Sequence, residues 1–429
     1  MPTGNTVPAR NGVQRDGLRV RLVVPGNVRH NSGGNVYNAA LARELAALGV
    51  EVDTCPLDGD WPVGSAADRQ RLAALLGDGD KRDGDKGGGT GVGGDRTDLS
   101  GNGPGAGRTV TLVDGLLACG APDELAAAAA AGRPAWILLH MPLDDAGHGE
   151  AGLERRALRA AAGVICTSGS AAEAIRARHG LDGVRVALPG TDSAELASGS
   201  EPPHFLAVAA LLPNKDQSLL LAALPALLDL AWTASLVGSD TADPGYAALL
   251  RDAVKRLGLQ DRIRIPGELR GGALESEWAA ADLSLLISQA ETFGLVVTES
   301  IARGVPVVVR AGTGAVEALA AGTAAPPAAG TAVPSAPPEP AAALPGAAVA
   351  LETDPAPLTE VLRRWLSDPG VRTRWRAAAV DARERLPGWD ATARTVLAAL
   401  DLEPPAPPPE APQEKPAAED SPAAPAGGQ

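Results

Sequence analysis

The stretch "DLSLLISQAETFGLVVTESIARGVPVVV" (residues 282–309) contains two short apolar runs separated by a turn and a longer segment. The runs "LSLLIS" and "VPVVV" are typical of strands buried on both faces of a parallel sheet. The turn at Gly294 is followed by residues that favour a helix. A strand, a helix and a second strand in this order form a βαβ unit, so the stretch predicts a parallel sheet with helices on its faces.

Strands and helices alternate in the same way along the rest of the chain. The first half starts with the strand "LRVRLVV" (18–24) and the helix "VYNAALARELAALG" (36–49). The pattern restarts with "HFLAVAAL" (204–211) and "QSLLLAALPALLDL" (217–230). We therefore predict an α/β protein with two Rossmann-like domains, separated near "SAELASGSEPP" (193–203), that face each other across a cleft.

The predicted domains follow this division. We expect an N-terminal domain at residues 18–195, a C-terminal domain at 196–388, and a last helix at 389–401 that crosses back to the first domain.

Four segments have a composition that does not favour a packed core. They are residues 1–17, the Gly/Asp-rich stretch 77–107, the Ala/Pro-rich stretch 321–343, and the acidic Pro/Ala-rich end at 402–429. Because such segments bury little apolar surface, we expect the two internal stretches to be flexible insertions and the two ends to be disordered. We interpret these stretches as linkers and tails, with binding of a partner as the alternative for the Pro-rich tail.

Composition limits the classes of function. A chain of 429 residues with 45% hydrophobic residues supports two cores, and a net charge of −14 argues against binding to nucleic acid. No apolar run is long enough to span a bilayer, and the N-terminus lacks the apolar region of a signal peptide. Cys55, Cys119 and Cys166 are scattered without metal-ligand spacing, so we expect reduced, structural thiols in a cytoplasmic protein.

Ligand-binding residues are expected in the loops after the strands, because open parallel sheets bind ligands at the carboxyl ends of their strands. Gly33 and Gly34 open the first helix and allow a ligand close to the backbone, although a simple turn explains them equally well. Their spacing is not G-x-G-x-x-G, so the nicotinamide fingerprint is absent. His140 follows "AWILL" and either donates a hydrogen bond to a substrate hydroxyl or belongs to a capped loop.

The second half presents a lysine and two glutamates in the same kind of position. Lysine is rare in this arginine-biased chain, and Lys215 stands just before a helix, where its charge suits a phosphate. Glu291 lies in the loop before Gly294, and Glu299 in the second turn of the helix that follows. A solvated turn lysine and a solvated helix glutamate are the alternatives. We favour a single polar ligand held by all three, with its anionic part at the helix N-terminus.

These segments resemble the retaining GT-B glycosyltransferases of family 4, also called glycosyl transferases group 1. "ETFGLVVTE" matches the Glu-x7-Glu motif of that family, and "FLAVAALLPNKDQSLLLAALPAL" resembles its strand and helix around a lysine that binds the donor phosphate. "VRVALPGTD" resembles the segment that closes the first domain, "GGNVYNAALARELAALGVEV" the N-terminal Gly-rich loop and helix, and "LLHMP" the first-domain histidine. The resemblance covers roughly residues 18–401 apart from the insertions.

The resemblance implies a GT-B fold and an enzyme that transfers a sugar from a UDP- or GDP-sugar to an acceptor, with retained anomeric configuration. No cofactor and no obligatory metal are implied, because the nucleotide-sugar is a co-substrate. Lys215 would neutralise the donor diphosphate, Glu291 would hold hydroxyls of the transferred sugar, and Glu299 would bind the ribose hydroxyls. His140 would touch the transferred sugar near the reacting centre.

Backbone groups complete the implied site. The N–H groups of Phe293, Gly294 and Leu295 would bind sugar or phosphate, and Gly34, together with Gly33, would line the diphosphate side. The implied catalytic residues are His140, Lys215 and Glu291, and the implied donor-binding residues are Gly33, Gly34, Lys215, Glu291, Phe293, Gly294, Leu295 and Glu299. The acceptor, whether a glycan, a lipid or a small molecule, is not implied.

Two positions depart from the family pattern. Ala210 stands five residues before Lys215, where the family usually has an arginine, so half of the cationic clamp is missing. Loss of a charged phosphate contact of this kind weakens transition-state binding by roughly 2–4 kcal/mol. Arg270 or Arg310 is a candidate to replace it. Ala315 stands where a second glycine is common, while Gly314 and Glu317 are kept.

Two other functions are alternatives to sugar transfer. A catalytically impaired GT-B protein would serve as a binding or scaffold subunit, and Ala210 motivates that reading. A sugar-nucleotide epimerase or a dinucleotide enzyme on two Rossmann-like halves is the other, and the absent G-x-G-x-x-G argues against its dinucleotide form. No basic amphipathic helix is evident in the first domain, so we expect no strong attraction to anionic lipid.

Overall fold

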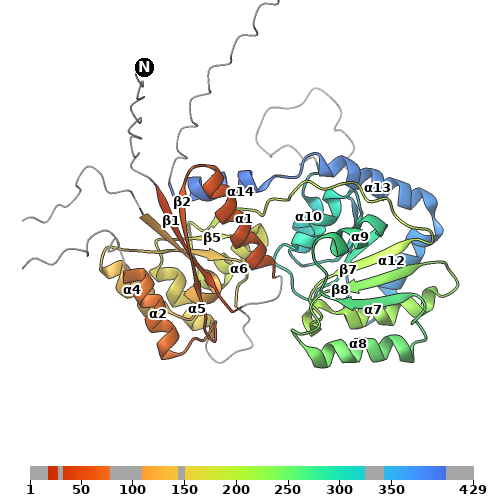
Figure 1. The fold of residues 1–429 in the computed structure, drawn as a ribbon, viewed down its shortest axis with the longest axis horizontal. Coiled ribbons are helices and arrows are strands. Elements are labelled where there is room, and N and C mark those ends of the chain that lie inside the picture. Colours follow the sequence, from red (N-terminus) through yellow and green to blue (C-terminus); the bar gives the residue numbers. More distant parts are fainter. Residues whose placement is uncertain (1–17, 28–31, 78–108, 144–149, 324–342, 402–429) are drawn as a thin grey trace, which may run out of the picture.

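A computed structural model of the protein describes residues 18–27, 32–77, 109–143, 150–323 and 343–401. These residues form two α/β domains that lie side by side (Figure 1). Residues 1–17 and 402–429, and most of 77–107 and 321–343, fall outside the described ranges, so their predicted disorder remains a prediction.

The first domain is built on a six-stranded sheet in the order β2-β1-β3-β4-β5-β6, in which every recorded pairing is parallel. Its elements are β1 (Arg19–Pro25), α1 (Gly33–Ala47), β2 (Glu51–Leu57), α2 (Ala66–Gly77), β3 (Thr109–Asp114), α3 (Gly115–Ala118), α4 (Pro122–Ala130), β4 (Trp136–Leu139), α5 (Glu150–Ala160), β5 (Gly163–Cys166), α6 (Gly169–His179) and β6 (Arg185–Val186).

The second domain has a six-stranded parallel sheet in the order β12-β11-β10-β7-β8-β9. Its elements are β7 (His204–Val208), the 3₁₀ helix η1 (Pro213–Lys215), α7 (Gln217–Ala223), the 3₁₀ helix η2 (Leu224–Leu227), β8 (Thr233–Val237), α8 (Pro244–Arg256), β9 (Ile263–Gly267), α9 (Gly272–Ala280), β10 (Leu283–Leu286), α10 (Leu295–Ala302), β11 (Val307–Arg310), α11 (Ala315–Ala320), β12 (Gly346–Val349), α12 (Ala356–Ser367) and α13 (Pro369–Arg383). The last helix of the chain is α14 (Trp389–Ala399).

The strand order of each sheet reverses at one place, and these places position the site. In the first sheet the reversal lies between β1 and β3, and in the second between β7 and β10. The loops that leave two such strands diverge to opposite faces of the sheet and leave a crevice at their carboxyl ends. The second sheet has the strand order of a dinucleotide-binding Rossmann fold, in which ligands bind in that crevice.

The predicted strand–helix–strand at 282–309 is present as β10, α10 and β11. All four residues of β10 and all four of β11 are buried, as expected for central strands covered on both faces. The alternation of strands and helices in two parallel sheets confirms the predicted α/β fold.

Three elements differ from the sequence-based expectation. The first helix begins at Gly33, before the expected residue 36, because the hydroxyl of Ser32 caps it by accepting the N–H of Asn35 at 3.2 Å. The helix expected over 217–230 ends after Ala223 and continues as a 3₁₀ turn, since Pro225 cannot supply an N–H to an α-helix. Strand β12, which the pattern did not predict, pairs with β11.

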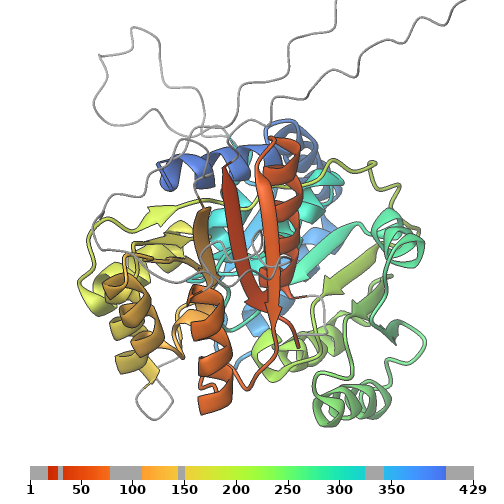
Figure 2. The ribbon, with the colours of Figure 1, turned by 60° about the vertical axis from the view of Figure 1, so that its left-hand side comes forward.

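The end of the described chain returns to the first domain. Helix α14 packs against α1, and Trp389, Val396 and Leu397 are buried in the first-domain core with Leu41. Figures 1 and 2 show this C-terminal segment, coloured blue, running from the second domain onto the first. The two chain segments that pass between the domains touch, because the N–H of Thr191 donates to the carbonyl of Pro387 at 2.9 Å.

Within the described ranges, no helix combines the length and the apolar character needed to cross a membrane.

Candidate active site at the facing ends of the two sheets

Lys215 and Glu291 meet at the point where the second sheet reverses. Lys215 ends η1 after β7, and Glu291 lies in the loop after β10. The ammonium of Lys215 donates to Oε2 of Glu291 at 2.8 Å, and 23% and 17% of the two side chains are exposed. The loops are also joined through the N–H of Gln289, which donates to the carbonyl of Asn214 at 2.8 Å. The structure thus brings together two predicted site residues that lie in different loops.

The helix N-terminus next to this pair is open. Gly294 precedes α10 with φ of 89°, a left-handed conformation that favours glycine. Within the described chain, the N–H groups of Gly294, Leu295 and Val296 donate to no acceptor, and the first turn of α10 carries no acidic residue. Free N–H groups at the positive end of a helix form an anion site. Phe293 is buried beneath this turn and supports it.

Glu299 lies one turn further along α10, on the same side as Leu295. Its carboxylate forms no hydrogen bond with a described residue and is half-buried. Burial raises the pKa of Glu299, and the nearby charge of Arg303 only partly offsets this. A carboxylate that is shielded from water and has no hydrogen-bond donor from the protein is suited to accept hydrogen bonds from the hydroxyl groups of a ligand.

The first domain presents the N-terminus of α1 to the same place. A side-chain carbon at Gly33 would lie 3.7 Å from the Leu295 side chain of the second domain, so the N-termini of α1 and α10 face each other. A side-chain carbon at Gly34 would lie 3.2 Å from Cδ2 of His140. Small residues here let the two helix ends and the imidazole approach closely. Gly33, Gly34 and His140 are therefore brought together opposite α10.

His140 is held by two buried residues that the sequence reading missed. Its Nε2 lies 3.0 Å from Oδ1 of Asn38 and 3.3 Å from Oδ2 of Asp114, and its ring packs edge-on against Tyr37. Burial alone would raise the pKa of Asp114, but the contacts with His140, Asn38 and the N–H of Leu116 outweigh it and lower the pKa. The signals were present in the sequence, because Asp114 ends a strand and Asn38 follows Gly34 by one helical turn.

Arg270 and Arg310 are the candidates to replace the arginine that is missing at position 210. Both are engaged in other contacts. Arg310 is buried, and its guanidinium binds Asp216 and the carbonyls of Ile287 and Leu351. Arg270 is exposed and pairs with Glu268 at 2.7 Å. Ala210 therefore leaves Lys215 without a second cation from these two positions.

A carboxylate of the second domain reaches across to the first. Glu317 accepts the N–H of Gly169 at 3.0 Å and that of Ser170 at 3.2 Å, at the N-terminus of α6. The helix that carries Glu317 begins behind the Glu291 loop, since the N–H of Gly314 donates to the Glu291 carbonyl at 2.7 Å. The Glu291 loop and the interdomain contact are therefore joined by one short helix, α11.

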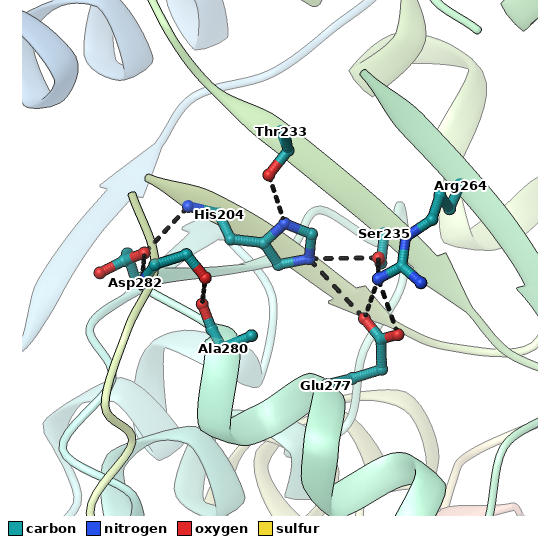
Figure 3. Close-up of polar contacts among 8 residues, drawn as sticks. His204, Thr233, Ser235, Arg264, Glu277, Ala280 and Asp282 are labelled. Atoms are coloured by element: carbon teal, nitrogen blue, oxygen red, sulfur yellow. Dashed lines mark hydrogen bonds and ion pairs between the residues drawn. The ribbon is translucent and has the colours of Figure 1, made fainter. Parts of the chain in front are cut away.

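A further polar cluster lies at the opposite end of the second sheet (Figure 3). His204 begins β7 and contacts Thr233 at 2.7 Å and Ser235 at 3.1 Å, while Arg264 pairs with Glu277 at 2.9 Å. These groups bond to one another at the amino ends of the strands. They anchor the sheet and take no part in the site at its carboxyl ends.

Comparison with known proteins agrees with this geometry. Residues 190–381 match the family model described as glycosyl transferases group 1. The mannosylfructose-phosphate synthase of Agrobacterium fabrum is 32% identical over 128 residues, which span 28% of this chain and 28% of that protein. The matched part is thus well under half of that relative.

Solved structures share the fold over nearly their whole length. A sucrose-phosphate synthase from Thermosynechococcus elongatus superposes with a TM-score of 0.63 at 18% identity, covering 90% of this chain and 98% of that one. Anabaena HepE in complex with UDP and glucose has a TM-score of 0.62 at 17% identity, covering 90% and 99%. Residues 190–381 are therefore similar to the glycosyl transferases group 1 family, and the described chain has the two-domain GT-B fold of the solved structures.

Proposed function

We propose that the protein is a retaining glycosyltransferase that moves a sugar from a UDP- or GDP-sugar to an acceptor. The observation that carries the proposal is the meeting of Lys215, Glu291 and the open N-terminus of α10 at the reversal of the second sheet. A cation and free N–H groups suit a diphosphate, and the carboxylate suits sugar hydroxyls.

The chemistry requires that negative charge be stabilised on the departing diphosphate. Lys215 supplies a full charge and α10 supplies oriented N–H groups, so the site has positive charge without an obligatory metal. His140 and the N-terminus of α1 belong to the first domain and lie opposite the N-terminus of α10. Closing two domains on the donor orients the acceptor and excludes water, which lowers the barrier to transfer.

In this proposal the same residues bind the nucleotide and the sugar of the donor. Glu299, half-buried and unpaired among the described residues, would accept the ribose hydroxyls, and Glu291 would release Lys215 to the diphosphate and bind the sugar. The structure of Anabaena HepE with UDP-glucose makes uridine nucleotides the first to test. Mannosylfructose-phosphate synthase and sucrose-phosphate synthase are named for the synthesis of phosphorylated sugars, so sugar phosphates are the first acceptors to test.

The second candidate function is a catalytically impaired GT-B protein that acts as a binding or scaffold subunit. Ala210 favours it, because Arg270 and Arg310 are both engaged elsewhere.

Release of nucleoside diphosphate from UDP- and GDP-sugars, with and without sugar phosphates, separates the two functions. The wild type should release product, and Lys215→Ala should lower the rate about 10²- to 10³-fold, as for loss of one charge-stabilising donor. Lys255→Ala is the control, because Lys255 lies on the surface of α8 with 70% of its side chain exposed. Nucleotide binding in a thermal-shift assay without any release would support the impaired protein instead.

A further inference from the structure

Asp114 and Asn38 both contact Nε2 of the His140 ring. The amide nitrogen of Asn38 donates to Oδ2 of Asp114 at 2.7 Å, and the N–H of Leu116 donates to Oδ1 at 2.9 Å. Both side chains are buried, with 4% of each residue exposed. A buried polar group that is bonded on several sides has little freedom to rotate.

These contacts allow one arrangement of protons. An ionised carboxylate only accepts hydrogen bonds, so Asn38 must turn its NH₂ group toward Asp114. Its carbonyl oxygen then faces Nε2 of His140, and the second neighbour of Nε2 is Oδ2 of Asp114. Because both neighbours are acceptors, Nε2 must carry a proton in order to bond with them.

The other ring nitrogen is free. Gly34 packs near Cδ2 of His140, so Nδ1 lies on the ring edge away from α1. Within the described ranges, Nδ1 bonds to no residue and is absent from the buried unpaired polar atoms, so solvent reaches it. In a neutral imidazole with the proton on Nε2, Nδ1 presents a lone pair.

We propose that Asp114 and Asn38 are positioning residues that hold His140 in its Nε2–H tautomer, so that Nδ1 accepts a hydrogen bond from a sugar hydroxyl. The identity of that ligand rests on the proposed glycosyltransferase function. The tautomer is a property of the protein without ligand. The orienting carboxylate thereby decides whether the histidine accepts or donates at the substrate, and it makes His140 an acceptor where the sequence alone suggested a donor.

The tautomer is measured directly by imidazole ¹⁵N NMR of the full chain at about pH 8, where imidazole is neutral. The chain has 5 histidines, and the His140 signals are assigned by their loss in His140→Gln. The wild type should show a protonated Nε2 and an unprotonated Nδ1. Asp114→Asn places a donor beside Nε2 and should move the proton to Nδ1. A wild-type His140 with its proton on Nδ1 overturns the proposal.

Asp68→Asn is the matched control, because Asp68 is a buried carboxylate of the same domain that accepts the N–H of Ser65 and lies outside the site. It should leave the His140 tautomer unchanged. If Asp114→Asn does not fold, Asn38→Ala keeps the Leu116 contact of Asp114 and should raise the fraction of the Nδ1–H form. An unchanged tautomer in the folded variant at Asp114, or in Asn38→Ala, overturns the positioning role.

Kinetics give the functional test. Asp114→Asn should lower kcat/KM about 10- to 100-fold, because small misplacements of a group that positions the substrate have effects of this size, and Asp68→Asn should not. A folded Asp114→Asn with wild-type kcat/KM overturns the functional part of the proposal. Absence of transfer by the wild type would refute the proposed function while the NMR result still decides the tautomer.

Discussion

In the proposed function, Lys215 exchanges one partner for another when a donor binds. In the free protein its ammonium pairs with Glu291 at 2.8 Å, and both side chains retain some exposure. Partly exposed ion pairs are worth of the order of 1 kcal/mol, whereas charge-assisted bonds to phosphate are stronger. Opening the pair is therefore a small cost, and it frees Lys215 for a diphosphate and Glu291 for hydroxyl groups at the same time.

Restoring the missing cation tests how much Ala210 limits the site. Ala210 is only partly buried, so the longer side chain of Ala210→Arg has a route to solvent and to the Lys215 loop. We expect kcat/KM for the nucleotide-sugar to rise about tenfold, because a second donor stabilises the departing diphosphate. Ala210→Leu, which adds bulk without charge, should not raise it. Equal rates for Ala210→Arg and wild type would mean that another group already supplies this charge.

His204 makes stability depend on pH. Burial lowers its pKa below the ordinary 6.5, with smaller opposing effects of Glu277 and Asp282 and a reinforcing effect of Arg264. As the pH falls below about 6.5, His204 therefore binds a proton in the unfolded chain before it does so in the folded protein. The free energy of unfolding decreases as the pH falls. His204→Gln should show a smaller loss of urea midpoint between about pH 7.5 and about pH 5.5 than the wild type. An equal loss in both proteins would contradict this assignment.

At the scale of elements, the start of α11 packs against the backbone of the Glu291 loop. A side-chain carbon at Gly314 would lie 1.8 Å from the Thr292 carbonyl oxygen, although its φ of −61° suits any residue. Gly314→Ala should therefore displace the loop and weaken nucleotide-sugar binding at least tenfold, since small misplacements are costly in such sites. Gly272→Ala, which meets no atom within 4 Å, is the control for binding measured by calorimetry. Unchanged affinity in Gly314→Ala would show that the loop adapts.

The position of each site residue in the fold explains whether the sequence could predict it. Lys215, Glu291 and Gly294 were predictable, because each follows a recognisable strand and the loops after strands bind ligands. Asn38 and Asp114 pair across 76 positions, and Glu317 meets Gly169 across 148. Such partners depend on how helices pack on the sheets and on how the domains close, and no local pattern carries that information. The end of α7 and strand β12 were missed for a simpler reason: Pro225 stops a helix that the apolar periodicity would continue, and "GAAV" is short and rich in alanine.

At the scale of the whole molecule, Glu317 joins the two domains at the site. Its carboxylate binds two N–H groups at the N-terminus of α6, and a charge at that end of a helix is favourable. Glu317→Ala should shift the population toward a more open arrangement and raise the KM for the donor several-fold, since such bonds contribute about 1–3 kcal/mol. Small-angle scattering with and without nucleotide measures the opening. Glu360→Ala, at an exposed position on α12, should scatter like the wild type, and identical curves for all three would remove Glu317 from this role.

The return of α14 to the first domain bears on how such proteins can be recombined. Trp389, Val396 and Leu397 belong, together with Ala393, Ala399 and Leu400, to a core whose remaining buried members precede residue 190, so the second domain is an insert within the first domain's chain and not its sequel. An exchange of donor specificity between relatives should therefore transplant residues 196–388 between two fixed junctions and leave α14 with its own first domain. A simple replacement of everything after residue 195 would pair each first domain with a foreign last helix.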